Sequence, residues 1–460
     1  MTPPLKKIVI IGGFGWQDIG DEAMPQAVIY NLRNRITNLN IVMFSPNPSY
    51  TSTYHKERSI QDVNAYLQKK LRIFSILTSR RLGILGKIIR KCYPSDLEYF
   101  LRWVYFLIVA KCRILGVYLP IDKTANAILD ELSNADLLFN NGGGNINTLL
   151  SGELYKQTLT ILAASILKIP VILSGQTIGP ITKKIDAFVV KVALNKADTI
   201  TLRDRGISLQ RLREIGVKRP IIKDTADDAT GLPVLRKEES MSLIIDNDGY
   251  EWLDLPANIV AVINMNGYLK AMGKNNIEEM HKEVSLLSHV ADKLVEVYDA
   301  KVLLVPTDYN LASDDRPLLV RIKEGMHRSK KALVIEREYD AIQYKTLISL
   351  GDLAIGARYH FVVFATSMGV PCIGLANGVY QKIKLKGIMQ LYGLPECFID
   401  EDMEKVDFNL VWSVVEKVMK NREQISEQLK KRTAFLQDEA MITISRAASI
   451  LSANHHRETQ

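Results

Sequence analysis

The 460-residue sequence is poor in cysteine, and its four cysteines stand far apart. Cys92, Cys112, Cys372 and Cys397 form no CxxC pair, so neither a zinc site nor a disulfide framework is expected, and a reducing cytoplasm fits. The N-terminus runs directly into a predicted strand and has no apolar segment of the kind that precedes a secretory cleavage site. We therefore expect a cytoplasmic protein.

Two phosphate-binding signatures are also missing. The first predicted strand turns through glycines at 12, 13 and 15, but their spacing is not G-x-G-x-x-G, and no G-K-[ST] occurs for a P-loop. This disfavours a nicotinamide cofactor and an NTPase. No clustering of carboxylates with histidine in the sequence demands a metal, so we expect no cofactor and no metal.

Length and charge leave several partners open. A chain of 460 residues exceeds one usual domain, so two large domains are expected. The net charge of +8 and the pI of about 9.0 suit an anionic small ligand, an anionic membrane surface or nucleic acid. Nucleic acid is the least favoured of these because no reader motif is present.

Alternating strand and helix patterns recur in two halves, which predicts an α/β fold. We expect an N-terminal Rossmann-like domain over 1–235, a C-terminal Rossmann-like domain over 236–425, and a C-terminal helix and tail over 426–460. A polar stretch at about 230–257, expected to be irregular, links the halves in this prediction. Asp21 is expected to cap a helix that runs to about Arg33. Three strands of the first half end in glycine-bearing loops. A single loop of this kind is more often a structural turn than a ligand loop, but three in one domain favour a shared cleft.

Residues of about 56–125 interrupt the alternation and are rich in basic residues. Eight cations stand with no acid among them, interleaved with aliphatic residues: Lys69, Lys70, Arg72, Arg80, Arg81, Lys87, Arg90 and Lys91. An aromatic run follows, but Arg102 and Lys111 cut it below the about 20 apolar residues of a spanning helix. Two alternatives remain: amphipathic helices that lie on a membrane, or a helical insertion with a solvated basic face.

The most informative stretch runs from Gly351 to Leu394. A buried strand at 353–355, a helix-length apolar segment at 361–368 and a strand at 372–375 predict a β-loop-α-β unit. Its first loop carries Arg358 and His360, at the end of a parallel sheet where ligands collect. Arginine can bind a carboxylate or phosphate through two N–H groups, and histidine can exchange a proton near neutral pH. The alternative is that Arg358 caps a carbonyl and His360 is a satisfied buried polar group.

These motifs, in this order, resemble the polysaccharide pyruvyl transferase family. The family's G-N-x-G-D-E-A loop corresponds, with a small insertion, to Gly15-Trp-Gln-Asp-Ile-Gly-Asp-Glu-Ala23. Its later motifs correspond to the Asn141–Gly144 strand end, the G-Q-x-I-G-P loop at 175–180, Arg203-Asp204, Arg358-Tyr359-His360 with the A-x-x-x-G-V-P that follows it, and Lys384. The resemblance does not cover the basic insertion.

The resemblance implies a GT-B-like fold, in which two Rossmann-like domains face each other across a cleft. It implies phosphoenolpyruvate as donor and a sugar of a polysaccharide or glycan precursor, lipid-linked or not, as acceptor, with a pyruvate ketal as product. By position, the family's R-x-H pair assigns donor binding to Arg358 and His360.

Residue chemistry suggests roles for the matched positions. We expect His360 to be the general acid, because the unperturbed pKa of histidine is about 6.5. Asp21 or Glu22 is expected to be the base; the alternative is that this pair only caps a helix. Lys384 is expected to supply a positive charge to the phosphate of the donor. Further substrate contacts are expected from Arg203 and Tyr359 and from the first-half loop residues Gly143, Gly144, Asn145 and Gln176.

Two other functions stay open from the sequence. One is a nucleotide-sugar glycosyltransferase of the same fold. The other is a catalytically silent member that docks on a membrane through residues 56–125.

Overall fold

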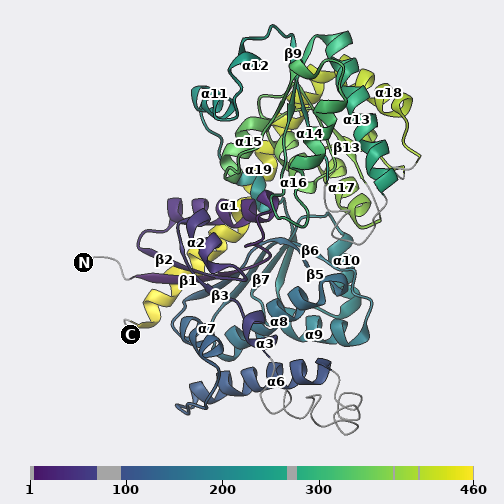
Figure 1. Ribbon diagram of the computed structural model, residues 1–460. Helices are drawn as coiled ribbons and strands as arrows, with labels where there is room; N and C mark the ends of the chain where they lie inside the picture. Colours follow the sequence, from purple (N-terminus) through teal and green to yellow (C-terminus); the bar gives the residue numbers. More distant parts are fainter. Residues whose placement is uncertain (1–4, 70–94, 267–276, 377–378, 402–404, 459–460) are drawn as a thin grey trace, which may run out of the picture.

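The computed structural model describes residues 5–69, 95–266, 277–376, 379–401 and 405–458. The chain forms two α/β lobes, each built on a parallel sheet with helices on both faces (Figure 1). The expected α/β fold with two Rossmann-like halves is confirmed. The basic residues 70–91 of the expected insertion lie outside the described residues.

The sheet of the first lobe has the order β3-β2-β1-β4-β6-β7-β8, and β5 pairs with the outer part of β6. All its pairings are parallel, and its central strands are buried on both faces, which explains their nearly continuous apolar runs. The strands are β1 (Lys6–Ile11), β2 (Leu39–Ser45), β3 (Arg58–Gln61), β4 (Leu137–Asn140), β5 (Gly143–Ile146), β6 (Val171–Ile178), β7 (Thr199–Leu202) and β8 (Ile221–Asp224).

Helices cover both faces of this sheet. They are α1 (Ile19–Arg35), α2 (Pro48–His55), α3 (Asn64–Leu67), α6 (Ser95–Ile114), α7 (Lys123–Ser133), α8 (Ser151–Ile166), α9 (Lys184–Leu194) and α10 (Ile207–Ile215), with 3-10 turns η2 (Thr148–Leu150) and η3 (Asp228–Gly231).

The sheet of the second lobe has the order β11-β10-β9-β12-β13-β14 and is also parallel throughout. The order reverses between β9 and β12, the position at which open α/β sheets bind ligands. The strands are β9 (Ile259–Ile263), β10 (Ala300–Leu304), β11 (Ala332–Val334), β12 (Leu353–Gly356), β13 (Cys372–Leu375) and β14 (Phe398–Ile399).

The helices of the second lobe include the two that carry the predicted site, α16 (Tyr359–Ser367) and α17 (Val379–Leu391). The others are α11 (Lys237–Ile245), α12 (Tyr250–Asp254), α13 (Ile277–Tyr298), α14 (Arg316–Gly325), α15 (Ala341–Ile348), α18 (Phe408–Lys420) and α19 (Arg422–Glu458), with 3-10 turns η5 (Ser329–Lys331) and η6 (Pro395–Cys397).

The long helix α19 leaves the second lobe and packs back across the first (Figure 1). Its buried Thr443 hydroxyl lies 2.8 Å from the Ser174 hydroxyl of β6, and Lys6 of β1 donates to the Leu451 carbonyl at 2.8 Å. The helix therefore fastens the two lobes together on one side.

Backbone pairing joins the lobes at the start of α1. Ile19 N–H donates to the Thr307 carbonyl at 2.8 Å, and Tyr309 N–H donates to the Gln17 carbonyl at 2.9 Å. Between these bonds Asp18 and Asp308 form an isolated antiparallel bridge. The loop after β10 thus fixes the N-terminal end of α1 against the second lobe.

Three local expectations were wrong. Asp21 does not cap α1: the helix begins at Ile19, and the Asp18 side chain accepts from Gly20 N–H at 2.8 Å. The stretch at 56–125 is not wholly helical, because β3 adds an edge strand there. The polar stretch at 230–257 contains the short helices α11 and α12.

Candidate functional site

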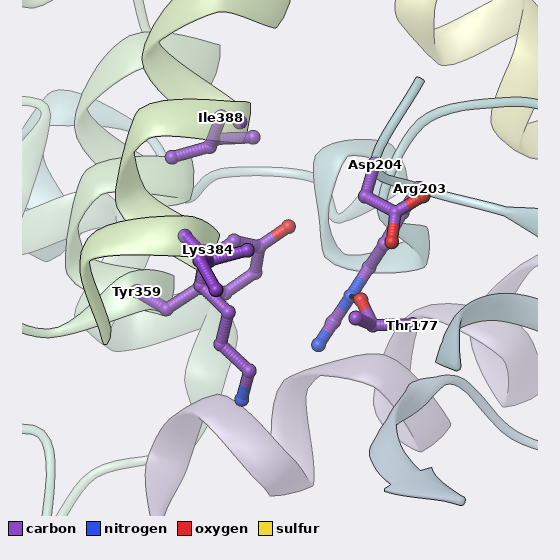
Figure 2. A pocket seen from close by; sticks show the side chains of 8 residues that line it. Thr177, Arg203, Asp204, Tyr359, Lys384 and Ile388 are labelled. Atoms are coloured by element: carbon purple, nitrogen blue, oxygen red, sulfur yellow. Dashed lines mark hydrogen bonds between the residues drawn. The ribbon is translucent and has the colours of Figure 1, made fainter. Parts of the chain in front are cut away.

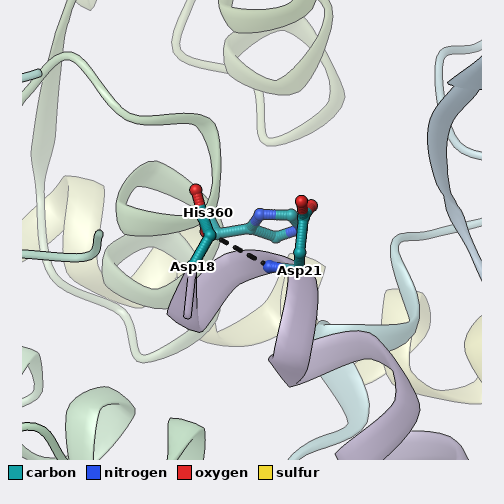
Figure 3. A group of neighbouring side chains, drawn as sticks. All are labelled: Asp18, Asp21 and His360. Atoms are coloured by element: carbon teal, nitrogen blue, oxygen red, sulfur yellow. Dashed lines mark hydrogen bonds between the residues drawn. The ribbon is translucent and has the colours of Figure 1, made fainter. Parts of the chain in front are cut away.

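The predicted Arg358 and His360 lie where the lobes meet. Strand β12 ends at Gly356, Arg358 is the N-cap of α16, and His360 is in its first turn. The N-terminal turn of α1 lies opposite and carries Asp18 and Asp21 (Figure 3). Two helix N-termini therefore face the same site, and each adds a partial positive charge.

His360 packs directly on the first turn of α1. One ligand atom from each of Asp18, Asp21 and His360 lies within 4.8 Å of the others, and we call these three residues the His–Asp cluster (Figure 3). Gly20 makes the contact possible: a Cβ there would stand 2.1 Å from His360 Nδ1. His360 is 8% exposed, so its ring is fixed between the lobes.

A buried ion pair stands on the other side of His360. Nε2 of His360 lies 3.6 Å from Oδ2 of Asp227, and the same oxygen accepts from Nη1 of Arg203. Arg203 also donates from Nε to Thr177 Oγ1 at 3.0 Å, and its guanidinium stacks over the Tyr359 ring at 4.6 Å. Arg203 and His360 are therefore oriented by one carboxylate.

A pocket opens beside this ion pair, between β7 of the first lobe and α17 of the second. Figure 2 shows the charged ends of Arg203 and Lys384 directed into the same space, one from each lobe. The pocket is small, and the space of about 270 Å³ inside it includes the open solvent at its mouth. We call it the cationic pocket; it is lined by Thr177, Arg203, Asp204, Tyr359, Ile383, Lys384, Gly387 and Ile388.

Arg358 has a different environment. Its Nη2 lies 2.6 Å from Asp315 and 3.1 Å from Asp308, and its Nη1 lies 3.5 Å from Asp18. We call these three acids the carboxylate ring. Arg358 is thus not only a carbonyl cap, as one alternative held, although it does donate to the Ser313 carbonyl at 3.2 Å.

Burial shifts the pKa of several carboxyl groups at this junction. Loss of solvation raises the pKa of Asp18, Asp21 and Asp308 to about 7 each, and neighbouring acids add to the effect. Arg358 opposes the shift at Asp18 and Asp308, and Lys384 opposes it at Asp21. These groups can therefore hold or release protons at neutral pH, as acid–base catalysis requires.

His360 and Asp227 are shifted in opposite senses to those acids. Burial lowers the pKa of His360, while Asp227 partly restores it and Arg203 and Lys384 lower it further. Burial alone would raise the pKa of Asp227, but Arg203 and His360 together hold it well below its ordinary value. Asp227 is therefore a fixed negative charge between Arg203 and His360.

The His–Asp cluster is also the group of described residues whose donor atoms are spaced to hold a metal ion. Two carboxylates and an imidazole would suit a divalent cation. Arg358 and Lys384 already supply positive charge to Asp18 and Asp21, so a cation would compete with them.

Other predicted residues lie within the first lobe. Glu22 is completely buried, accepts from Gly15 N–H at 2.7 Å and contacts His55 Nε2 at 2.8 Å, so it stabilises the loop before α1. Gln176 is buried and donates to the carbonyls of Asn140, Asn141 and Ser174.

The glycine-bearing loops pack on one another. A Cβ at Gly142 would lie 2.9 Å from the Gly175 carbonyl oxygen, and one at Gly13 would lie 2.0 Å from Nδ2 of Asn145. Gly143 has φ +133°, which a side chain would strain, and Gly144 beside it is buried. Close approach of the three strand ends thus accounts for these glycines.

Sequence reasoning missed Asp18, Asp308 and Asp315, and gave no role to Asp227 or Thr177. Asp227 stands three residues after the end of β8, and Thr177 lies near the end of β6. Both positions are at the carboxyl edge of a parallel sheet, which was a usable signal. Asp308 and Asp315 follow β10 at the same edge of the second sheet.

Known proteins share this architecture. A UDP-GlcNAc 2-epimerase from Methanocaldococcus jannaschii superposes with a TM-score of 0.53 at 12% identity, covering 90% of this chain and 92% of that one. A UGT transferase from Siraitia grosvenorii, solved with UDP, gives a TM-score of 0.53 at 10% identity, with 97% and 99% coverage. At these identities the likeness shows the fold alone, and the GT-B-like expectation is confirmed.

Sequence comparison gives a narrower result. The amylovoran biosynthesis protein AmsJ of Erwinia amylovora is 20% identical over 434 residues, which covers 92% of this chain and 95% of that protein. Residues 18–378, which include the His–Asp cluster and Arg358, match the profile of one transferase family. This chain belongs to the polysaccharide pyruvyl transferase family.

Proposed function

We propose that the protein transfers the pyruvyl group of phosphoenolpyruvate to a sugar of a polysaccharide or glycan precursor, as a ketal. The observation that carries this proposal is the position of the cationic pocket directly beside His360 and the His–Asp cluster. Family membership and the polysaccharide-biosynthesis relative support the transferase class.

The pocket suits a small and highly charged donor. Phosphoenolpyruvate carries a phosphate and a carboxylate on three carbons, and it needs cations and hydrogen-bond donors more than apolar surface. Arg203 and Lys384 supply the cations, and Thr177 and Tyr359 supply hydroxyl groups. We assign the donor's anionic groups to this pair, with the N-terminus of α16 adding positive potential behind it.

His360 is placed to protonate the donor. Its pKa is lowered by burial, so the imidazolium is a stronger acid than free histidine, and a bound trianion would raise its protonation. The proton goes to the methylene carbon of phosphoenolpyruvate, which becomes a methyl group and leaves an oxocarbenium-like centre at C2. Such a group contributes on the order of 10²–10⁴ in rate.

The acceptor then reacts twice at C2. The first sugar hydroxyl attacks C2 and loses its proton, the C2–O bond to phosphate breaks, and the second hydroxyl closes the ketal with loss of its own proton. One of these protons replaces the one given to carbon, and the other leaves with hydrogen phosphate. Asp21, whose pKa is raised to about 7 by burial, is the proposed base, since Glu22 is sealed inside the lobe.

Product analysis tests the proposal. Candidate glycans incubated with phosphoenolpyruvate in D₂O should release phosphate and gain one pyruvate less one water by mass, plus one mass unit for the deuterium taken from solvent. NMR should show one deuterium in the ketal methyl group, because a solvent-exchangeable acid supplies that hydrogen. His360→Ala should abolish the product without lowering the melting temperature.

The competing nucleotide-sugar reaction gives the opposite result. Sugar transfer from a UDP-sugar, with no phosphate release from phosphoenolpyruvate, would overturn the proposal. Ketal formation retained in His360→Ala would remove His360 from the mechanism while leaving the overall reaction intact.

A further inference from the structure

Helix α6 presents apolar side chains on both of its faces. It lies along the outer end of the first lobe, at the bottom of Figure 1, and packs inward on α8. Its inner residues Phe106, Val109 and Ala110 are at most 1% exposed. The opposite side, continued into the turn after the helix, we call the α6 outer face; it comprises Phe100, Leu101, Tyr105, Ile108, Leu115 and Tyr118.

The outer face is exposed along its length. Leu101 is 45% exposed, Ile108 is 47%, Leu115 is 69% and Tyr118 is 79%. A helix on the surface of a globular protein usually turns polar residues to water. A continuous apolar face of this kind marks an interaction surface.

The distribution of charged residues along the chain indicates what kind of partner binds the α6 outer face. The chain has 59 basic and 51 acidic residues, and residues 69–91, which precede α6 in sequence, contain eight basic residues and no acid. The remaining 51 basic residues are matched by 51 acids, so the whole net charge of +8 belongs to this stretch. Lys111 on α6 is exposed and adds a further cation to the helix itself.

We propose that the α6 outer face lies flat on an anionic lipid surface. An amphipathic helix bound in this way inserts its apolar side chains at the headgroup boundary, and nearby lysines and arginines meet the lipid phosphates. Tyr105 and Tyr118 carry hydroxyls at this depth, where tyrosine is favoured. Contact along the surface fits the helix, because no helix in the described part of the chain is long and apolar enough to cross a bilayer.

Vesicle co-sedimentation of the full-length protein tests this proposal. The protein should sediment with vesicles of phosphatidylcholine and phosphatidylglycerol, and much less with pure phosphatidylcholine. Added salt should weaken binding, because exposed charges are screened. The double substitution Leu101→Glu/Ile108→Glu should lower the fraction bound by about tenfold or more, since it removes two inserted side chains and adds two like charges.

A matched substitution controls for general effects of a new surface acid. Tyr250 in α12 is 63% exposed and lies on the second lobe, far from α6 (Figure 1). Tyr250→Glu should leave vesicle binding unchanged. Thermal unfolding of both variants checks that the fold is intact.

Three outcomes would overturn the proposal. The protein does not sediment with anionic vesicles; binding survives the double substitution; or the double substitution changes only the molecular mass in solution, which would make the face a contact between protein chains. These measurements use no phosphoenolpyruvate, so their outcome does not depend on whether the proposed reaction is correct.

Discussion

Two arginines at the lobe junction differ in what surrounds them. Arg358 contacts three carboxylates, of Asp315, Asp308 and Asp18, at 2.6, 3.1 and 3.5 Å. Arg203 binds the carboxylate of Asp227, and it also contacts a hydroxyl, a sulfur and an aromatic ring. Arg358 is therefore matched or exceeded by negative charge, whereas Arg203 and nearby Lys384 give the pocket its positive character.

The sequence motifs assigned substrate binding to both arginines, but their surroundings suggest two different roles. Arg358 joins the loop after β10, the start of α1 and the start of α16, so it positions the His–Asp cluster. Arg203 and Lys384 line the cationic pocket, to which the proposed donor is assigned. Under the proposed function, the charge around each guanidinium favours Arg203 over Arg358 as the arginine that binds the donor.

The largest expected effect is on stability, from removing Arg358. Arg358→Met leaves the buried Asp315 and Asp308 carboxylates without their cation, which should cost about 3–5 kcal/mol of unfolding free energy. Denaturant unfolding measures this loss. Arg316→Met is the control, because Arg316 binds Asp314 near the surface and such pairs contribute about 1 kcal/mol or less. Equal losses in both variants would contradict a structural role for Arg358.

The next effect is on turnover, from displacing His360. Gly20→Ala would place a Cβ 2.1 Å from His360 Nδ1, so the ring must move. A shift of about 1 Å can cost about 10²-fold in rate, and we expect that loss in kcat. Gly152→Ala, in the first turn of α8 with open space around it, should leave kcat unchanged. Normal turnover in Gly20→Ala would show that the contact does not matter for the chemistry.

A smaller effect is expected on donor affinity. Lys384→Ala removes a cation from the pocket, and we expect the KM for phosphoenolpyruvate to rise about tenfold, or about 1.4 kcal/mol. Lys386, two residues along α17, pairs with Asp400 at the surface, so Lys386→Ala should not change KM. Steady-state kinetics on the two variants compares pocket and surface lysines on one helix. An equal rise in KM in both variants would show that the donor binds outside the cationic pocket.

The smallest effect concerns pH. The pKa of Asp21 is raised to about 7 by burial, so the folded protein binds a proton that the unfolded chain has lost between about pH 4 and 7. The protonated Asp21 carboxyl contributes fully to stability below pH 4, and this contribution is lost as the pH rises through 7. Asp21→Asn should therefore lose less stability than the wild type between pH 5 and 7, by about 1 kcal/mol after screening.

Urea unfolding at both pH values measures this difference. Comparing the two proteins cancels the opposing contribution of His360, whose pKa is lowered by burial. An identical pH dependence in wild type and Asp21→Asn would contradict the raised pKa.

Much of the fold was predictable because parallel strands are locally encoded. Strand Cys372–Leu375 has the predicted bounds and strand Leu353–Gly356 extends one residue beyond them, since each is a short buried apolar run. The helix start at Asp18 was missed because it depends on a partner far away: the bridge to Asp308 fixes the chain there. Asp21, three residues on, had the same local propensity for a cap.

The site was predictable in part for the same reason. Arg203, Arg358, His360 and Lys384 stand in short motifs that point to an anion site. Their partners Asp308 and Asp315 lie 50 and 43 residues before Arg358, and only tertiary packing brings them to it. The sequence therefore identified the cationic side chains, but not the carboxylates that distinguish the role of Arg358 from that of Arg203.

A structure with bound phosphoenolpyruvate tests the central claim most directly. We predict that the phosphate and carboxylate lie in the cationic pocket against Arg203 and Lys384, that the methylene carbon faces His360, and that the Arg358–Asp315 contact is kept. A donor bound instead through Arg358, with that contact broken and Lys384 uninvolved, would contradict the account.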